Sequence, residues 1–186
     1  MRSGASARMP LPHRQSSSHD APHEHKSAAP AAIGCMVITC SDTRTPETDT
    51  SGALIKDLLK ARGHQVVSHQ IIKDEPPLIR DLIQQGAKDP AVQAIIINGG
   101  TGISRRDATF EAVDGLLQKK LDGFGEIFRY LSYKDIGSAA IMSRAVAGLY
   151  QGTIIISIPG SEKAVRLAME QLILNELGHM VREMTK

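Results

Sequence analysis

Two segments of this chain have the composition of phosphate-binding loops, because each follows an apolar run and is rich in small residues. They are Asn98-Gly99-Gly100-Thr101-Gly102 and Pro159-Gly160-Ser161. Glycine lets the backbone approach a ligand closely, and the exposed N–H groups of such a loop can bind an anion. Two such loops indicate a ligand with more than one phosphate. Taken alone, the first is equally typical of a strand-to-helix turn, and it matches neither the P-loop nor the dinucleotide fingerprint.

Three carboxylates accompany these loops: Asp42, Asp74 and Asp107. Asp42 and its neighbour Ser41 end the first apolar run and are candidate ligand contacts. Carboxylates repel phosphates unless a cation lies between them, and Mg²⁺ prefers hard oxygen ligands. The sequence therefore predicts an Mg²⁺ site. Asp74 has an alternative role as the N-cap of the helix that follows it, whereas for Asp107 a cap is not expected because Thr109 is better placed.

Basic residues near the same loops could neutralise charge on a leaving pyrophosphate: Arg105, Arg106 and Arg144. Arg105 and Arg106 could instead lie in a solvated loop with no contact to the ligand. A Ser-His-Asp triad has no support, because the histidines at 64, 69 and 179 are widely separated and no nucleophile elbow is present.

The elements that must position these residues follow from the apolar pattern. Nearly continuous apolar runs, typical of strands buried on both faces, span residues 33–39, 94–97 and 154–158, with a weaker strand over 64–72. One-faced helices are expected around 54–59 and 78–83, and a long final helix over 161–184. Ligands of open α/β sheets bind outside the carboxyl ends of the strands. The predicted fold is α/β, a three-layer α/β/α sandwich around a mainly parallel sheet.

The first part of the chain differs in composition from the rest. Residues 1–31 hold six Ser, four of the nine Pro and four of the seven His. Such a segment cannot bury enough apolar surface to offset its ordering entropy, so we predict a disordered tail over 1–31 and one domain over 32–186. The tail histidines could bind a transition metal; a solvated tail is the alternative.

Composition excludes several classes of protein. The net charge is +2, and beyond the tail 18 basic residues balance 18 acidic ones, with no Trp. A nucleic-acid platform needs a basic, aromatic surface, so nucleic acid is not an expected partner. No apolar run reaches the ~18 residues of a membrane-spanning helix. Cys35 and Cys40 fit no zinc or redox spacing, and their odd offset along a strand points them to opposite faces. We therefore expect a cytoplasmic protein without a disulfide.

Seven segments, taken in order, resemble those of the MoaB/MogA family of molybdenum cofactor biosynthesis proteins. They are Ser41-Asp42, Asp49-Thr50-Ser51-Gly52, Asn98-Gly99-Gly100-Thr101-Gly102, Arg106-Asp107-Ala108-Thr109 with Glu111-Ala112, Gly123-Phe124-Gly125-Glu126, Ser143-Arg144-Ala145-Val146-Ala147-Gly148 and Pro159-Gly160-Ser161. The resemblance covers about four-fifths of the chain, residues 33–184. The stretch 128–133, followed by Ile136-Gly137, is closer to MoaB than to MogA.

The resemblance implies a reaction and a set of residues. Active members transfer AMP from Mg-ATP to the terminal phosphate of molybdopterin and release pyrophosphate. The family's catalytic or Mg²⁺-linked aspartates correspond to Asp74 and Asp107, its pterin- and phosphate-contacting serines to Ser132 and Ser143, and its phosphate loop to 99–102. A non-catalytic molybdopterin-binding or carrier protein with the same pocket is the alternative. A pyridine-nucleotide domain akin to CinA is a more distant one.

One position departs from the family pattern. Many members have Pro where this chain has Phe110, just before Glu111. A Pro in the first helical turn would make the loop that carries Asp107 more rigid. Phe110 removes that constraint and could pack against the ligand instead.

The resemblance also implies a homotrimer or homohexamer, with other molybdenum cofactor biosynthesis proteins as possible partners. The expected final helix is apolar on more than one stripe, because Leu167, Leu174 and Met184 lie off the face of Val165, and this favours a second subunit. The tail has no apolar surface with which to hold an interface. A chain that starts at Ile33 should therefore keep the oligomeric state and the melting temperature of the intact chain. Its mass by sedimentation should be lower only by the mass of the removed tails. A smaller oligomer after truncation would contradict this.

Overall fold

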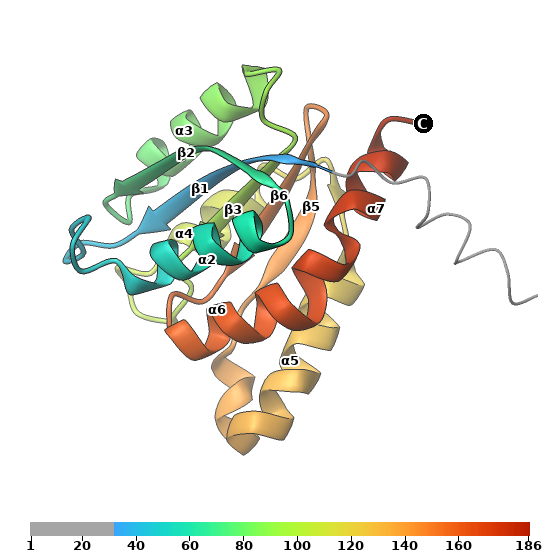
Figure 1. Ribbon diagram of the computed structural model, residues 1–186. Coiled ribbons are helices and arrows are strands. Elements are labelled where there is room, and N and C mark those ends of the chain that lie inside the picture. The colour runs from blue at the N-terminus through green and yellow to red at the C-terminus, as the bar shows by residue number, and fades with distance from the viewer. Residues whose placement is uncertain (1–31) are drawn as a thin grey trace, which may run out of the picture.

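The apolar runs form a six-stranded sheet in the computed structural model, which describes residues 32–186 (Figure 1). The strands are β1 (Gly34–Cys40), β2 (Gln65–Ile72), β3 (Ala94–Asn98), β4 (Lys119–Lys120), β5 (Val146–Tyr150) and β6 (Thr153–Ile158). Their order is β2-β1-β3-β6-β5-β4, and the first four are parallel to one another. This confirms the predicted mainly parallel sheet.

Helices cover both faces of the sheet. They are α2 (Thr50–Ala61), α3 (Pro76–Lys88), α4 (Thr109–Asp114), α5 (Asp122–Ile136), the 3₁₀-helix η1 (Gly137–Met142), α6 (Glu162–Ala168), the π-helical segment η2 (Met169–Ile173) and α7 (Leu174–Met184). Buried side chains of α2, α5, α6 and α7 pack on one face, and those of α3 and α4 on the other. The predicted three-layer sandwich is confirmed.

Alternation along β1 shows why a nearly continuous apolar run is needed. Cys35 and Val37 belong to the core beneath α2 and α6, whereas Met36, Ile38 and Cys40 belong to the core beneath α3. Successive side chains of a strand point to opposite faces, so both faces must be apolar when helices cover both. The two thiols are free and buried on opposite sides, as predicted.

The sheet continues beyond β6 as an antiparallel edge that the apolar pattern did not reveal. β5 pairs with β6 through the tight turn at Gln151 and Gly152, and the two-residue β4 pairs with β5. β4 consists of two exposed lysines and has no apolar signature. β5 is apolar and mostly buried, but it was not assigned as a strand from the sequence. Within residues 32–186, no helix is both long and apolar enough to cross a bilayer.

The C-terminal helix corrects one expectation. It is interrupted by η2, where the wider π-helical turn shifts the buried face and brings Leu174 into the same core as Val165. Leu167 and Met184 pack partly buried against that core. These side chains are therefore no evidence for a second subunit, and Leu174 was wrongly placed off the buried face.

Exposed apolar side chains lie instead on the projection formed by α5 and η1, below the sandwich in Figure 1. They include Ile127, Tyr130, Ile141 and Met142. Exposed clusters of this kind mark interaction surfaces. The trimer or hexamer stays a prediction, and this projection is where we expect its subunits to meet.

Candidate functional site

A cavity of about 420 Å³ opens at the carboxyl ends of β3 and β6, beside α5 and η1. Ten of the predicted site residues line it: Gly99, Gly100, Thr101, Gly102, Asp107, Ser132, Ser143, Pro159, Gly160 and Ser161. The two glycine-containing loops thus form one wall of a shared cavity, as expected for the ends of neighbouring parallel strands. We call this the main cavity.

Other lining residues were not anticipated from the sequence. Lys163 lies in the first turn of α6. Asp135 and Ile136 come from the end of α5, and Met142 comes from η1. Lys163 is the only cation among the described lining residues. Its place two residues after Ser161 could have marked it, whereas Asp135 and Met142 carry no local signal. They reach the cavity only because α5 and η1 fold back toward the strand ends.

The first loop needs glycine for two reasons. Gly99 and Gly100 have φ of 102° and 57°, values that side-chain-bearing residues rarely adopt. A Cβ on Gly100 would lie 2.1 Å from Oδ2 of Asp74 and 2.2 Å from Oγ1 of Thr109, and one on Gly99 would lie 2.1 Å from the carbonyl oxygen of Cys40. The loop is therefore packed tightly on the residues behind it, so its shape is fixed before a ligand arrives.

Asp74 lies directly behind this loop and does not cap α3. The N-cap residue of α3 is Glu75, which makes no side-chain cap bond, because Pro76 and Pro77 occupy the first turn. Oδ1 of Asp74 instead accepts hydrogen bonds from the hydroxyl of Thr109 at 2.9 Å and from the backbone N–H of Ala108 at 3.3 Å. Asp74 therefore ties the end of β2 to the start of α4, and Thr109 is not the N-cap there but the first helical residue.

The environment of Asp74 disfavours its charge. The side chain is buried, and this burial, together with the neighbouring charges of Asp107 and Asp42, raises its pKa above the ordinary value for aspartate, although the bonds from Thr109 and Ala108 oppose the shift. The three predicted carboxylates therefore lie within electrostatic reach of one another. A cation placed among them would relieve this repulsion.

Asp107 and Asp42 occupy different positions around this group. Asp107 lines the main cavity, and its Oδ2 accepts a hydrogen bond from the N–H of Ser104 at 3.1 Å. Asp42 is exposed and pairs with the guanidinium of Arg106, which lowers the pKa of the carboxyl. Arg106 therefore links the loop after β1 to the loop after β3, and Asp42 does not line the main cavity.

Arg144 also lies outside the main cavity, although its neighbour Ser143 lines it. Its Nε donates to the carbonyl oxygen of Thr101 at 2.8 Å, and its terminal nitrogens contact the carbonyl oxygen of Gly102 and the carboxylate of Glu111. The guanidinium carbon lies 4.8 Å from the ring centroid of Phe110. Phe110 thus packs against Arg144, which explains why the aromatic ring is not among the lining residues.

A smaller cavity of about 140 Å³ adjoins the main one and shares Gly99 and Gly160 with it. Ser41, the remaining predicted contact, lines this cavity together with Arg44 and others. The hydroxyl of Ser51, in the first turn of α2, donates to the carbonyl oxygen of Gly160 at 2.8 Å. The strand ends therefore offer two adjacent hollows with a wall of glycine backbone between them.

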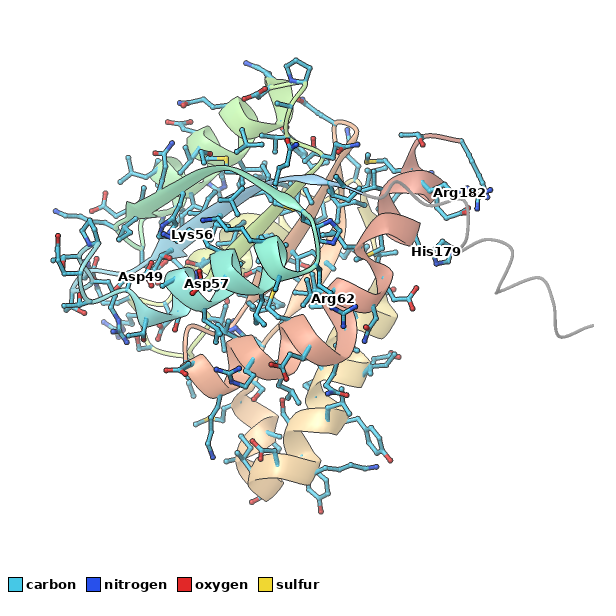
Figure 2. The ribbon with its side chains drawn as sticks, viewed as in Figure 1. Asp49, Lys56, Asp57, Arg62, His179 and Arg182 are labelled. Carbon is cyan, nitrogen blue, oxygen red and sulfur yellow. The ribbon has the colours of Figure 1, made fainter. Side chains whose placement is uncertain are left out.

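A buried polar network supports the smaller cavity. Asp49 caps α2 by accepting from the N–H of Gly52 at 2.9 Å, and it also accepts from the hydroxyl of Thr39 at 2.6 Å. Nε2 of His69 lies 3.0 Å from Oδ2 of Asp49, and the amide of Asn98 donates to the hydroxyl of Thr39 at 3.0 Å. Figure 2 shows Asp49 at the start of α2, next to the loop that connects β1 to this helix. The network connects β2 to the residue before the glycine loop.

We expect two histidines, His69 in this network and His64 just before β2, to make stability depend on pH. Burial and the charge of Lys56 lower the pKa of His69, and burial lowers that of His64, whose Nδ1 accepts a hydrogen bond from the N–H of Ile33. The unfolded chain therefore binds more protons below pH 6.5, the ordinary value for histidine, and stability should be full above that pH and fall as the pH drops below it.

The variant His69→Gln should flatten this dependence, because glutamine can still donate to Asp49 but does not titrate. Urea midpoints measured on either side of pH 6.5 would test it. Equal slopes for the variant and the natural protein would show that His69 is not responsible.

The metal-binding capacity of the site is limited. No group of three or more His, Cys, Asp or Glu side chains among residues 32–186 is arranged to hold a metal ion. The hydrogen bonds described above engage Oδ1 of Asp74 and Oδ2 of Asp107, which leaves one oxygen of each carboxylate for another ligand. Mg²⁺ usually binds one or two carboxylates and completes its shell with water and substrate phosphates. Asp107 lines the main cavity and fits an ion of that kind, whereas Asp74 lines neither cavity and its charge would act from behind the glycine loop.

Comparison with known proteins identifies the family of this chain. Residues 36–179 match the family model described as a probable molybdopterin binding domain. The chain is 53% identical over 164 residues to the molybdenum cofactor biosynthesis protein B of Bacillus subtilis and to that of Halalkalibacterium halodurans, which covers 88% of this chain and 96% of each relative. The residues matched by the family model include all those that line the main cavity.

Solved structures are similar over the same region. A crystal structure of a molybdenum cofactor biosynthesis protein B superposes with a TM-score of 0.82 at 49% identity, covering 84% of this chain and 98% of the other. The tungsten cofactor synthesizing protein MoaB from Pyrococcus furiosus gives 0.77 at 32% identity, covering 85% and 100%. The chain therefore belongs to the MoaB/MogA family of molybdenum cofactor biosynthesis proteins, and within it to the MoaB branch.

Proposed function

We propose that this protein adenylylates molybdopterin, transferring AMP from Mg-ATP to its terminal phosphate and releasing pyrophosphate. The observation that supports this most is the main cavity itself, in which two glycine-containing strand ends face a carboxylate, Asp107, with Asp74 behind the first loop. Backbone N–H groups at such loops suit several phosphates. A neighbouring pair of carboxylates suits the cation that accompanies them.

In the proposed reaction, an oxygen of the terminal phosphate of molybdopterin attacks the α-phosphorus of ATP. A new P–O bond forms, the bond between the α-phosphorus and the bridging oxygen breaks, and pyrophosphate carries away the electron pair. The loops at 99–102 and 159–161 bind and align the phosphates, and Ser132 and Ser143 line the same cavity. Asp107 would bind Mg²⁺, with the charge of Asp74 behind the loop, and the ion would neutralise the charge that develops on pyrophosphate.

A carrier that binds molybdopterin without reacting is a second candidate. Asp74 is occupied by two hydrogen bonds that hold α4 in place, so it also has a structural reason to be present. In a carrier, the main cavity would bind the pterin and its phosphate, and Asp74 would serve only to shape the glycine loop.

Incubation of the purified protein with molybdopterin, ATP and Mg²⁺ distinguishes these candidates. We expect pyrophosphate release that depends on molybdopterin and stops when EDTA removes Mg²⁺. Binding of molybdopterin without pyrophosphate release would favour the carrier. Failure of molybdopterin to bind would contradict both.

A further inference from the structure

We propose that Arg144 is a positioning residue that closes the loop between β3 and α4, instead of a direct contact of the substrate phosphates. The loop runs from Gly99 to Ala108 and carries Asp107 near its end. The inference concerns the same site as the proposed adenylylation. Only its activity measurement rests on that reaction, because hydrogen exchange of the loop can be measured without turnover.

Arg144 joins the two ends of this loop. At the beginning it bonds to the carbonyl oxygens of Thr101 and Gly102, and at the far end it pairs with Glu111 in the first turn of α4. A guanidinium offers five donors in a rigid plane and can serve several acceptors at once, whereas the ammonium group of lysine cannot reproduce that geometry. The residues between these contacts, Asp107 among them, are therefore confined by one side chain from outside the loop.

Phe110 completes the arrangement. Its ring lies under the guanidinium at 4.8 Å, and the side chain of Arg144 keeps only 24% of its surface exposed. Stacking on an aromatic face and pairing with a carboxylate together fix the plane of the guanidinium. In this chain the loop end is thus held through Arg144 and Phe110, which replaces the local stiffness that a proline at position 110 would give.

Through its neighbour Ser143, Arg144 also connects the loop to another part of the cavity lining. Ser143 lines the cavity, whereas Arg144 bonds to the loop and does not line it. Because the two residues are adjacent, the contacts of Arg144 set the distance between Ser143 and the glycine loop. These contacts engage four of the five N–H donors of the guanidinium.

Hydrogen exchange of the loop amides tests the proposal without any substrate. In Arg144→Lys, amides of residues 99–109 should exchange about tenfold faster or more, because bonds to a charged group are lost. Amides of β1 and β6 should be unchanged, which shows that the domain remains folded. Arg62→Lys, at the exposed end of α2 (Figure 2), is the matched control and should leave the loop unchanged.

Glu111→Gln provides a second variant, because Glu111 is 60% exposed and its change keeps the helix intact. It should accelerate exchange of the same amides by less than Arg144→Lys. For the natural protein and both variants, pyrophosphate affinity measured by calorimetry should fall in step with loop exchange, and kcat should fall more than KM rises.

Two results would overturn the proposal. The first is loop exchange at the natural rate in Arg144→Lys together with lost pyrophosphate affinity, which would make Arg144 a direct phosphate contact. The second is tighter pyrophosphate binding in Glu111→Gln, since that would mean Glu111 competes with phosphate for Arg144. If the natural protein shows no turnover, the exchange and calorimetric results still decide the role of Arg144, and only the adenylylation is lost.

Discussion

Replacing Asp107 by Asn is expected to lower the rate of AMP transfer by a factor of about 10² or more, the usual cost of removing one group that stabilises transition-state charge. The asparagine side chain would keep an oxygen that accepts from the N–H of Ser104, so the loop should hold its shape. Molybdopterin affinity should therefore stay near that of the natural protein. The loss would fall on the chemical step, because only the negative charge is removed.

Asp114→Asn is a suitable control for this variant. Asp114 ends α4 and pairs with Lys120 at 2.7 Å, away from the residues that line the main cavity. Removal of its charge should leave AMP transfer unaltered. Pyrophosphate release under saturating ATP and molybdopterin gives both rates, and an unchanged rate in Asp107→Asn would remove Asp107 from the mechanism.

Replacing Gly100 by Ala should weaken the binding of both ATP and molybdopterin and destabilise the domain. The new Cβ would lie near 2.1 Å from Oδ2 of Asp74, and the position has a φ of 57°. Left-handed backbone costs a residue with a side chain about 1–2 kcal/mol, and forcing an extra carbon into a packed site typically costs about 1–3 kcal/mol. The loop must shift to accommodate the methyl group, so the N–H groups that we propose bind phosphate would move with it.

Gly63→Ala separates these two contributions. Gly63 has a φ of 80° after α2, but no heavy atom lies within 4 Å of the position that its Cβ would take. It should therefore carry the backbone cost alone and leave both affinities intact. Urea denaturation and calorimetric titration provide the comparison. Equal destabilisation by the two substitutions would show that the space behind Gly100 is not restricted.

The sequence was sufficient to predict the parallel part of the sheet, because β1, β3 and β6 are buried on both faces and must be apolar throughout. It was equally sufficient for the loops at 99–102 and 159–161, since their position after a strand determines which edge they reach. β4 and β5 were missed. A two-residue strand of lysines is defined by its pairing with a neighbour and has no pattern of its own.

Side-chain partners were harder to predict than positions. For Asp74 the alternative to a role at the cation was a cap on the helix next to it in sequence, yet the carboxylate bonds to Thr109, 35 residues away. Arg144 was expected to face phosphate, yet it bonds to backbone carbonyls 42 and 43 residues away. Such contacts depend on how the loops fold over the strand ends. Local spacing does not contain that information.

The two buried cysteines of β1 can report when the helical layers separate from the sheet. Burial raises the pKa of Cys35 and of Cys40 to about 12, so almost no thiolate exists at neutral pH and alkylation must wait for exposure. Cys35 lies under the layer that contains α2 and α6, and Cys40 under the layer that contains α3. Pulse labelling of the two thiols would therefore time the detachment of each helical layer separately, from two positions on one strand.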